Sequence, residues 1–264
     1  MSSTTPSSFP PGSSASSASA SASPSLTERR KAATRMEIAR AAARLFVTHG
    51  LRGTRAEDIA QAAGIAPRTF YRYFATKEEA VAPLYAAGAQ RWAEAVRTAP
   101  AGLSVPQALE HAVRHTLTPG AGVSAAAWEW ARTLIRLART SPGLRKVWAE
   151  VCQEAEGGLA NVLAERERAE RLARETAERE RAERLARETA VREEEPVAPD
   201  NVADEGAVSP HLRFAAAVAS AAVRVAVESW AGSDDPYDGA SGPVESALRN
   251  LGALRGFPWE ERGD

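Results

Sequence analysis

Aromatic and basic residues crowd into one short stretch of the chain, AGIAPRTFYRYFATKEE at residues 63–79. A phenol hydroxyl can donate a hydrogen bond to phosphate, and a guanidinium group can bind phosphate in a bidentate fork. A protein core would bury the aromatic residues and leave the arginines elsewhere. The mixture is therefore typical of a surface that meets a phosphate backbone, and the chemistry expected of it is recognition rather than catalysis.

Two short helices are expected to position these side chains. The first covers residues 57–62, Gly64 ends it, and the second starts at Pro67, a residue favoured in a first helical turn. This arrangement is a helix-turn-helix, whose second helix can lie in the major groove of DNA. Phe70 and Phe74 lie four residues apart and are predicted to face inward.

The remaining side chains of the second helix divide by their expected contacts. Tyr71 and Tyr73 are predicted to point outward beside Arg68 and Arg72, where all four could bind phosphate. Arg68 and Thr69 occupy the first turn, from which side chains reach base edges. The sequence therefore predicts a DNA-binding face on this helix.

Two residues outside the recognition helix are expected to add to that face. Lys77 lies beside the start of the following helix, where backbone amides already attract an anion. Arg55 precedes the first short helix and could add a phosphate contact, while its neighbour Thr54 is expected to cap that helix. Residues 27–85 hold eleven Lys or Arg against six Asp or Glu, a net charge of +5, although the whole chain has a net charge of −1.

The rest of the chain is predicted to be helical, because Ala, Leu, Arg and Glu dominate and sustained alternation is absent. We predict an all-α fold of nine helices. A first helix covers 27–49, and a fourth follows Ala75 with Thr76 as N-cap and Glu79 as capping-box acid. The later helices are expected at 105–117, 125–139, 142–191, 210–231 and 244–254, the third of these with a break at Gly157–Gly158.

Two of these later helices have unusual patterns. The helix at 125–139 is expected to face the core with Trp130 and Leu134, and to turn Arg132, Arg136 and Arg139 away from it. The sequence AERERAERLARET occurs at 164–176 and again, unchanged, at 177–189. Thirteen residues rotate the second copy by about 220° from the first, so the repeat builds no continuous apolar seam. We expect a solvated, projecting helix that arose as a tolerated expansion.

The N-terminal region resembles the DNA-binding domain of the TetR family of bacterial transcriptional regulators. The residues that carry the resemblance are Leu45-Phe46, Gly50, Ile59-Ala60, Ala63-Gly64, Phe70-Tyr71, Phe74 and Lys77-Glu78. By this resemblance, Tyr71 and Lys77 occupy positions that touch phosphate, and Arg68 and Thr69 lie in the recognition helix. The chain departs from the family pattern at Arg55 and Ala66, where Thr or Ser commonly stands.

The resemblance also implies how the rest of the chain is organised. Members of the family are usually dimers whose C-terminal helices form a four-helix bundle and whose C-terminal cavity binds a small effector. The Ala-rich helix at 212–230 suits such an interface, or is simply the central helix of its domain. The expected division is a Ser/Ala-rich disordered tail at 1–26, a DNA-binding domain at 27–78, and a helical effector-binding and dimerisation domain at 79–264, which includes the duplicated helix at 164–190 and an acidic linker at 192–209.

Candidate residues for an effector pocket are His111, His115, Trp128, Trp130 and Phe214. The two histidines have the i, i+4 spacing of metal ligands, but no acidic or Cys partner accompanies them, so no metal is expected. The aromatic residues are as compatible with an ordinary core as with a pocket. No cofactor is expected either, because the sequence has no Gly-rich phosphate loop and no supported catalytic arrangement.

Together these features favour a DNA-binding transcriptional regulator, most simply a repressor that a small-molecule effector releases from its operator. The alternatives are a DNA-binding or architectural protein without an effector and, less well supported, a helical enzyme. The expected partners are an operator in double-stranded DNA, a second copy of the chain and an unknown small molecule. The single cysteine, Cys152, excludes an internal disulfide, and the absence of a secretory signal favours a cytoplasmic protein that does not span a membrane.

Overall fold

The computed structural model describes residues 25–118, 120, 125–188, 208–237, 239–254 and 256. Within these residues the regular structure is helical and no strand occurs, which confirms the predicted all-α fold. The elements are α1 (Leu26–His49), α2 (Ala56–Ala62), α3 (Pro67–Tyr73), the 3-10 helix η1 (Glu79–Val81), α4 (Ala82–Arg97), α5 (Val105–Leu117), α6 (Ala125–Thr140), α7 (Pro142–Glu188), α8 (Pro210–Gly232) and α9 (Pro243–Gly252).

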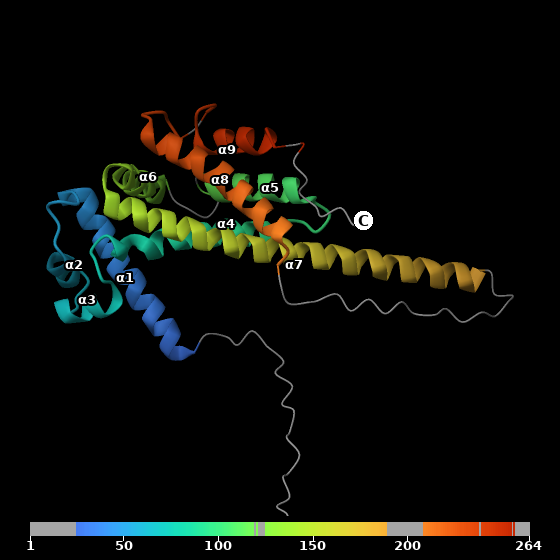
Figure 1. The fold of residues 1–264 in the computed structure, drawn as a ribbon, viewed down its shortest axis with the longest axis horizontal. Helices are drawn as coiled ribbons and strands as arrows, with labels where there is room; N and C mark the ends of the chain where they lie inside the picture. Colours follow the sequence, from blue (N-terminus) through green and yellow to red (C-terminus); the bar gives the residue numbers. More distant parts are fainter. Residues whose placement is uncertain are drawn as a thin grey trace, which may run out of the picture.

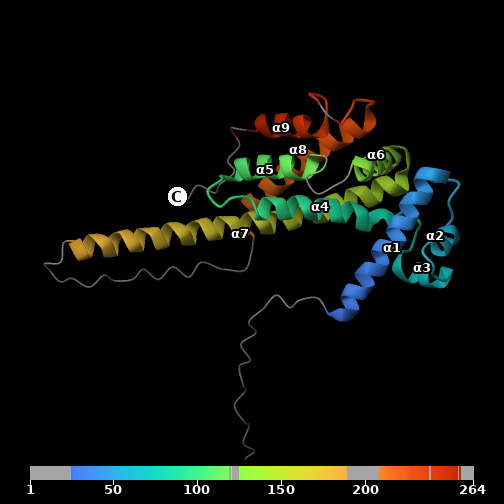
Figure 2. The ribbon, with the colours of Figure 1, turned by 180° about the vertical axis from the view of Figure 1, so that it is seen from behind.

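The helices form two groups, which the paired helices α4 and α7 connect. Helices α1, α2 and α3 lie together at one end of the molecule (Figure 1). Helix α4 leads away from them and packs along α7, and α5, α6, α8 and α9 cover one side of this pair, as the view from behind also shows (Figure 2). The N-terminal three-helix group is therefore attached to the rest of the chain through α4, with further contacts between α1 and α6.

The apolar residues of the three N-terminal helices are part of the core that runs through the described helices. Helix α1 starts at a Ser25 cap, whose hydroxyl accepts a hydrogen bond from the Glu28 amide at 3.2 Å. It ends at Gly50, where a φ of 72° needs a residue without a β-carbon. Ile59 and Phe70 are fully buried against α1. The apolar residues predicted to face inward therefore do so.

Helix α4 begins after a short 3-10 turn rather than directly after Ala75. The Thr76 hydroxyl accepts a hydrogen bond from the Glu79 amide at 3.2 Å. However, the N-cap of η1 is Glu78 and that of α4 is Val81, so the prediction that Thr76 is the N-cap of this helix is wrong. The Glu79 carboxylate accepts from the Ala75 amide at 3.0 Å. The predicted capping box is therefore incomplete, because the Glu79 carboxylate accepts from the amide of Ala75 and not from that of Thr76.

Helix α7 is continuous over 47 residues, so the predicted break at Gly157–Gly158 is wrong. Glycine costs a helix interior only about 1 kcal/mol relative to alanine. Just after the two glycines, Leu159, Val162 and Leu163 are fully buried at helical spacing. Packing of this apolar stripe outweighs the weak helix propensity of the glycines.

Helix α8 is the one helix in the described part of the chain that is long and apolar enough to cross a bilayer by length and composition. In the structure it packs against α6, α7 and α9, and 44% of its most apolar window is buried there. Trp230 and Ala219 are among its most buried residues. One side of α8 therefore belongs to the core, and its other side is exposed.

The arginines of α6 do not face away from the rest of the protein, which corrects the expectation from the helical pattern. Arg132 Nη2 donates to the carbonyl oxygen of Ser233 at 2.6 Å, and Arg136 Nε donates to that of Ala231 at 2.9 Å. Arg139 lies against the same end of α8. The last carbonyls of a helix lack intrahelical partners and attract cations, so the arginines cap α8.

The first copy of the duplicated sequence starts inside the fold. Arg166 is 7% exposed, and its guanidinium donates hydrogen bonds to carbonyl oxygens at the end of α4 and in the turn that leads to α5. The four acceptors and their distances are Val96 at 3.3 Å, Ala99 at 2.8 Å, Pro100 at 3.1 Å and Leu103 at 3.0 Å. Beside it, the Glu165 carboxylate pairs with Arg97 Nε at 2.9 Å.

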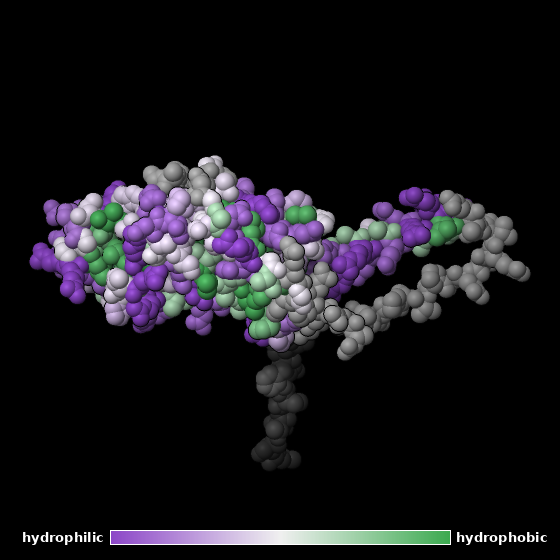
Figure 3. Space-filling model, turned by 90° about the horizontal axis from the view of Figure 1, so that it is seen from above, coloured by the Kyte–Doolittle hydropathy of each residue, from purple (hydrophilic) through white to green (hydrophobic). Residues whose placement is uncertain are grey.

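The second copy lies beyond the globular part of the protein. Its residues 177–187 are exposed, including Arg179, the counterpart of Arg166. Figure 3 shows this half of α7 as a mostly hydrophilic rod that projects from the body. Ion pairs at i, i+4 spacing form in both copies, between Glu170 and Arg174 in the first and between Glu183 and Arg187 in the second. The projecting helix predicted from the sequence is confirmed.

Two predicted segments fall mostly outside the described residues. These are the tail at 1–26, of which only Ser25 and Leu26 are described, and the linker at 192–209, of which only Val208 and Ser209 are described. The division of the chain into domains at residues 78 and 79 stays a prediction.

Candidate nucleic-acid interface

Helix α3 presents two contrasting faces. Phe70 and Phe74 are 0% and 3% exposed and their ring centroids lie 5.8 Å apart, so they anchor the helix to the core. Arg68, Tyr71 and Arg72 are exposed on the other side. The seven-residue helix is too short to be stable alone, so its outward side chains depend on the phenylalanine anchors for their position.

The two tyrosines of α3 differ in exposure. Tyr71 is 52% exposed, and its hydroxyl donates to Glu57 Oε1 at 3.3 Å. Partial desolvation and the Glu57 carboxylate raise the pKa of Tyr71, so the phenol remains a hydrogen-bond donor at neutral pH. Tyr73 is half-buried, and the Arg72 guanidinium lies 5.5 Å from its ring centroid. Of the two, Tyr71 is the better placed to meet a ligand.

Arg35 on α1 is a contributor to this face that the sequence reasoning missed. Its guanidinium lies 4.8 Å from the centroid of the Phe74 ring, and Nη1 donates to the Tyr73 carbonyl oxygen at 3.4 Å. It therefore holds the C-terminal end of α3. An exposed arginine near the start of a long helix carries no signal in the sequence that would have marked this contact.

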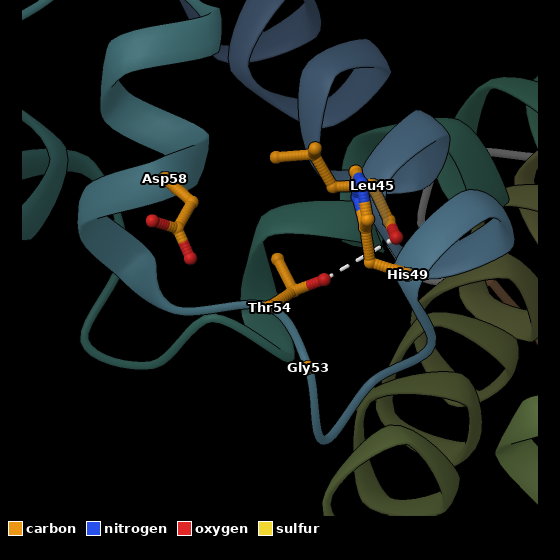
Figure 4. A pocket seen from close by; sticks show the side chains of 5 residues that line it. All are labelled: Leu45, His49, Gly53, Thr54 and Asp58. Carbon is orange, nitrogen blue, oxygen red and sulfur yellow. Dashed lines mark hydrogen bonds between the residues drawn. The ribbon is translucent and has the colours of Figure 1, made fainter.

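The start of α2 differs from the prediction. Thr54 was expected to cap α2, but its hydroxyl donates to the carbonyl oxygen of Leu45 at 3.2 Å (Figure 4). It also lies 2.9 Å from the carbonyl oxygen of Gly50, at the end of α1. Arg55 occupies the N-cap position, and its amide donates to Asp58 Oδ2 at 2.8 Å. The prediction is wrong because the Thr54 hydroxyl is bonded to carbonyl oxygens at the end of α1, and the N-cap of α2 is the next residue, Arg55.

A hollow of about 170 Å³ opens beside this turn. It is lined by Leu45, His49, Gly53, Thr54 and Asp58 (Figure 4). Such a volume holds a few water molecules but is smaller than the sites that usually bind small organic ligands. It is a shallow surface depression near α2 rather than an effector pocket.

Lys77 is bonded within the protein. Its ammonium donates to the carbonyl oxygens of Leu51 at 2.7 Å and Thr54 at 2.8 Å. Both acceptors belong to the turn between α1 and α2. The residue expected to touch phosphate therefore already has two protein partners in the free chain.

The structure does not bring the five effector-pocket candidates together. His111 and His115 are exposed on α5, where their rings stack with centroids 6.4 Å apart. Phe214 is 60% exposed on the outer side of α8, and Trp130 is half-buried. Trp128 is buried. In the described part of the chain, no group of three or more His, Cys, Asp or Glu residues is placed to hold a metal ion.

Trp128 instead belongs to an aromatic cluster with two residues that were not singled out from the sequence. Its ring centroid lies 6.1 Å from that of Trp230 and 5.3 Å from that of Tyr237. The Arg132 guanidinium lies 4.5 Å from the Trp230 ring centroid. The indole nitrogens of Trp128 and Trp230 are buried and find no hydrogen-bond acceptor among the residues that the structure describes. Buried donors without acceptors are rare and costly, so each of these two N–H groups would gain from an acceptor.

The fold and the exposed face of α3 define a helix-turn-helix DNA-binding protein. A short helix, a sharp turn at Gly64 with a φ of 69°, and a second helix with outward basic and phenolic side chains form the required motif. Comparison with known proteins agrees, because residues 38–82 match the profile of bacterial regulatory proteins of the tetR family. Residues 38–82 thus form a DNA-binding domain of the TetR type, and the chain is similar to TetR-family transcriptional regulators.

Two curated relatives show this similarity over different lengths. The HTH-type transcriptional regulator TcmR of Streptomyces glaucescens is 35% identical over 149 residues, which cover 54% of this chain and 65% of TcmR. MftR of Mycobacterium tuberculosis, named for regulation of mycofactocin biosynthesis, is 47% identical over 49 residues, or 19% of this chain and 25% of MftR. The chain thus spans just under two thirds of the first relative and a quarter of the second.

Solved structures of TetR-family proteins also align with the chain. One is FadR of Thermus thermophilus, a transcriptional repressor solved with lauroyl-CoA, at 22% identity and a TM-score of 0.45, covering 87% of this chain and 98% of FadR. A regulator from Mesorhizobium loti aligns with the same TM-score at 16% identity, covering 85% and 96%. The superpositions are too loose to carry a statement about ligand or mechanism.

Proposed function

We propose that the chain is a homodimeric, cytoplasmic repressor that binds a pseudo-palindromic operator and leaves it when a small molecule binds the helical domain. The observation that carries the proposal is the outward face of α3, where Arg68, Tyr71 and Arg72 are exposed together. Two such faces in a symmetric dimer would read half-sites about one turn of DNA apart.

The side chains on this face have different proposed roles. Tyr71 and Arg72 lie along the exposed side of α3 and would hold phosphates, with Arg55 at the start of α2 and Tyr73 contributing at the edge. Arg68 and Thr69 lie in the first turn of α3 and would reach base edges. Phosphate contacts set affinity and register, whereas the first-turn residues set the preferred sequence.

The outer face of α8 supports a dimer of two identical chains. Phe214 and Val225 are 60% and 47% exposed, and the partly buried Val218 and Ala221 lie between them at the spacing of one helical face. The four residues form an apolar stripe that contains no charged side chain and carries a small residue, Ala221, near its middle, where a second helix can approach closely. A second copy of α8 would cover it, as expected for an isologous interface.

The aromatic cluster supports an effector site between α6 and α8. Two buried indole N–H groups and the Arg132 guanidinium would favour a ligand with an aromatic or apolar body and a hydrogen-bond acceptor. Arg132 also caps α8, so a ligand that engaged it would change how α6 holds α8. A ligand shifts the protein only by its difference in affinity between the DNA-bound and released arrangements.

The proposal is tested by binding to the DNA that flanks the gene of this protein, with a shuffled duplex of equal composition as control and salt varied. Tight binding of two chains to the native flank, and release by aromatic compounds bearing an acceptor, would support the full proposal. Binding that no such compound changes would favour the alternative of a regulator or architectural protein without an effector. Equal, steeply salt-dependent binding to both duplexes would contradict an operator at this location.

A further inference from the structure

Lys77 joins two parts of the DNA-binding domain that are distant in sequence. Its ammonium lies just after α3 and donates to Leu51 and Thr54, 26 and 23 residues earlier, at 2.7 and 2.8 Å. An ammonium has three N–H donors, and two of them are used here. Hydrogen bonds from a charged donor are about twice as strong as neutral ones, so the side chain is held firmly in the turn between α1 and α2.

That turn determines where α2 begins. A β-carbon at Gly53 would lie 2.5 Å from the carbonyl oxygen of His49, so the turn is tight. Thr54 is 1% exposed and bonds to the end of α1, and the next residue, Arg55, is the N-cap of α2. A shift of the turn would therefore move Arg55 and the first turn of α2.

Helix α2 depends on contacts with other segments for its stability. It has seven residues, well below the length at which a helix is stable in isolation. Its apolar residues Ile59 and Ala60 are buried, but its exposed residue Glu57 accepts the hydrogen bond from Tyr71 on the recognition helix. The position of α2 thus affects both the Arg55 and the Tyr71 side chains of the proposed DNA face.

We propose that Lys77 is a positioning residue: it clamps the turn between α1 and α2 so that the DNA face is already assembled in the free protein. This inference rests on the proposed DNA-binding function. Binding a preformed face avoids the free-energy cost of ordering it on the DNA. Lys77 acts through α2 rather than through a phosphate, so its positive charge does not contribute to counterion release.

The salt dependence of DNA binding distinguishes a residue that positions the turn from one that contacts phosphate. Each phosphate neutralised by a side chain contributes about 0.9 to the slope of log K against log salt concentration. Replacement of Lys77 by Ala is expected to weaken DNA binding about tenfold with the slope unchanged. Arg72→Ala is the matched control, because Arg72 is exposed on α3. This variant is expected to make the negative slope shallower by about 0.9.

A second measurement needs no DNA. The amides of Ile59 and Ala63 donate to Arg55 and Ile59 in α2, and their hydrogen exchange in the free protein reports how often α2 opens. Lys77→Ala is expected to accelerate this exchange about tenfold, while Arg72→Ala leaves it unchanged. Lys77→Arg keeps a charged donor of similar reach and is expected to restore much of the protection and of the DNA affinity.

The opposite pattern would overturn the proposal. Lys77 is a phosphate contact if Lys77→Ala makes the negative slope of log K against log salt shallower by about 0.9 and leaves amide hydrogen exchange in α2 as in the wild type. A wild-type protein that binds no duplex would instead refute the proposed function, and the exchange measurement would still decide the clamp.

Discussion

The two copies of the duplicated sequence provide an internal control for one buried arginine. Arg166 and Arg179 are identical in residue type and local sequence, but Arg166 is 7% exposed and Arg179 is exposed. Replacing each by Ala changes the same chemical group on the same helix. The helix propensity effect is equal in the two variants, so the difference between them isolates the docking of Arg166.

The size of the expected effect follows from the four carbonyl oxygens that Arg166 binds at 2.8–3.3 Å. A hydrogen bond to a charged group contributes about 1.5–3 kcal/mol, but water can reach part of the turn and the bonds are not additive. We expect Arg166→Ala to lower the free energy of unfolding by about 3 kcal/mol in total. Arg179→Ala should change it by less than about 0.5 kcal/mol, as for other exposed positions.

Urea unfolding followed by tryptophan fluorescence is the suitable assay. The tryptophans among the described residues lie in α4, α6, α7 and α8, and none lies within the duplicated sequence, so the signal reports the core and not the projecting helix. In a thermal scan, about 3 kcal/mol corresponds to a fall of about 6–12 °C in Tm for a protein of this size. Arg166→Met keeps much of the apolar packing and should show most of the loss. Equal shifts for the Ala variants at 166 and 179 would refute the reasoning.

Four further outcomes are expected. Tyr71→Phe should weaken binding to all DNA sequences by about 1 kcal/mol in a fluorescence anisotropy assay, because it removes a phosphate donor; a changed sequence preference would instead make Tyr71 a base contact. Phe214→Asp combined with Val225→Asp should give monomers in sedimentation velocity, while Leu172→Asp with Leu185→Asp, at similarly exposed leucines of α7, should not. Burial raises the pKa of the Cys152 thiol to about 11, so alkylation by iodoacetamide at about pH 8 should be much slower than in urea and should rise as the pH approaches 11; equal rates with and without urea would contradict a shielded thiol. Deletion of residues 177–189 should leave Tm and DNA affinity nearly unchanged, and loss of the dimer would show that the repeat has a structural role.

Much of the fold could be predicted from local patterns. The α5 helix has the bounds that its proline and apolar spacing indicate, and Phe70, Tyr71 and Phe74 point in the directions that a helical period requires. These features depend on residues within a few positions of one another. Local periodicity is sufficient to predict them.

The features that could not be predicted are hydrogen bonds between distant segments. The pattern of α6 correctly separates Arg132 and Arg136 from the apolar stripe, but nothing local shows that the end of α8 lies opposite them. Lys77 looks like an exposed cation in the sequence because its two carbonyl acceptors lie more than twenty residues away. Polar side chains find partners according to the packed arrangement of the helices, which a single sequence does not state.

The projecting half of α7 also determines how the protein moves through solution. At about 1.5 Å per residue, one 13-residue unit adds about 20 Å to the rod. Because the copies are identical, loss of either one yields the same chain, which retains the docked Arg166 and has a shorter rod. The rod leads away from the end of the molecule that holds α2 and α3 (Figure 1). The number of repeats would therefore set the hydrodynamic drag of the protein. It would also set how closely another molecule can approach on the side where α7 projects, without a change in the rest of the fold.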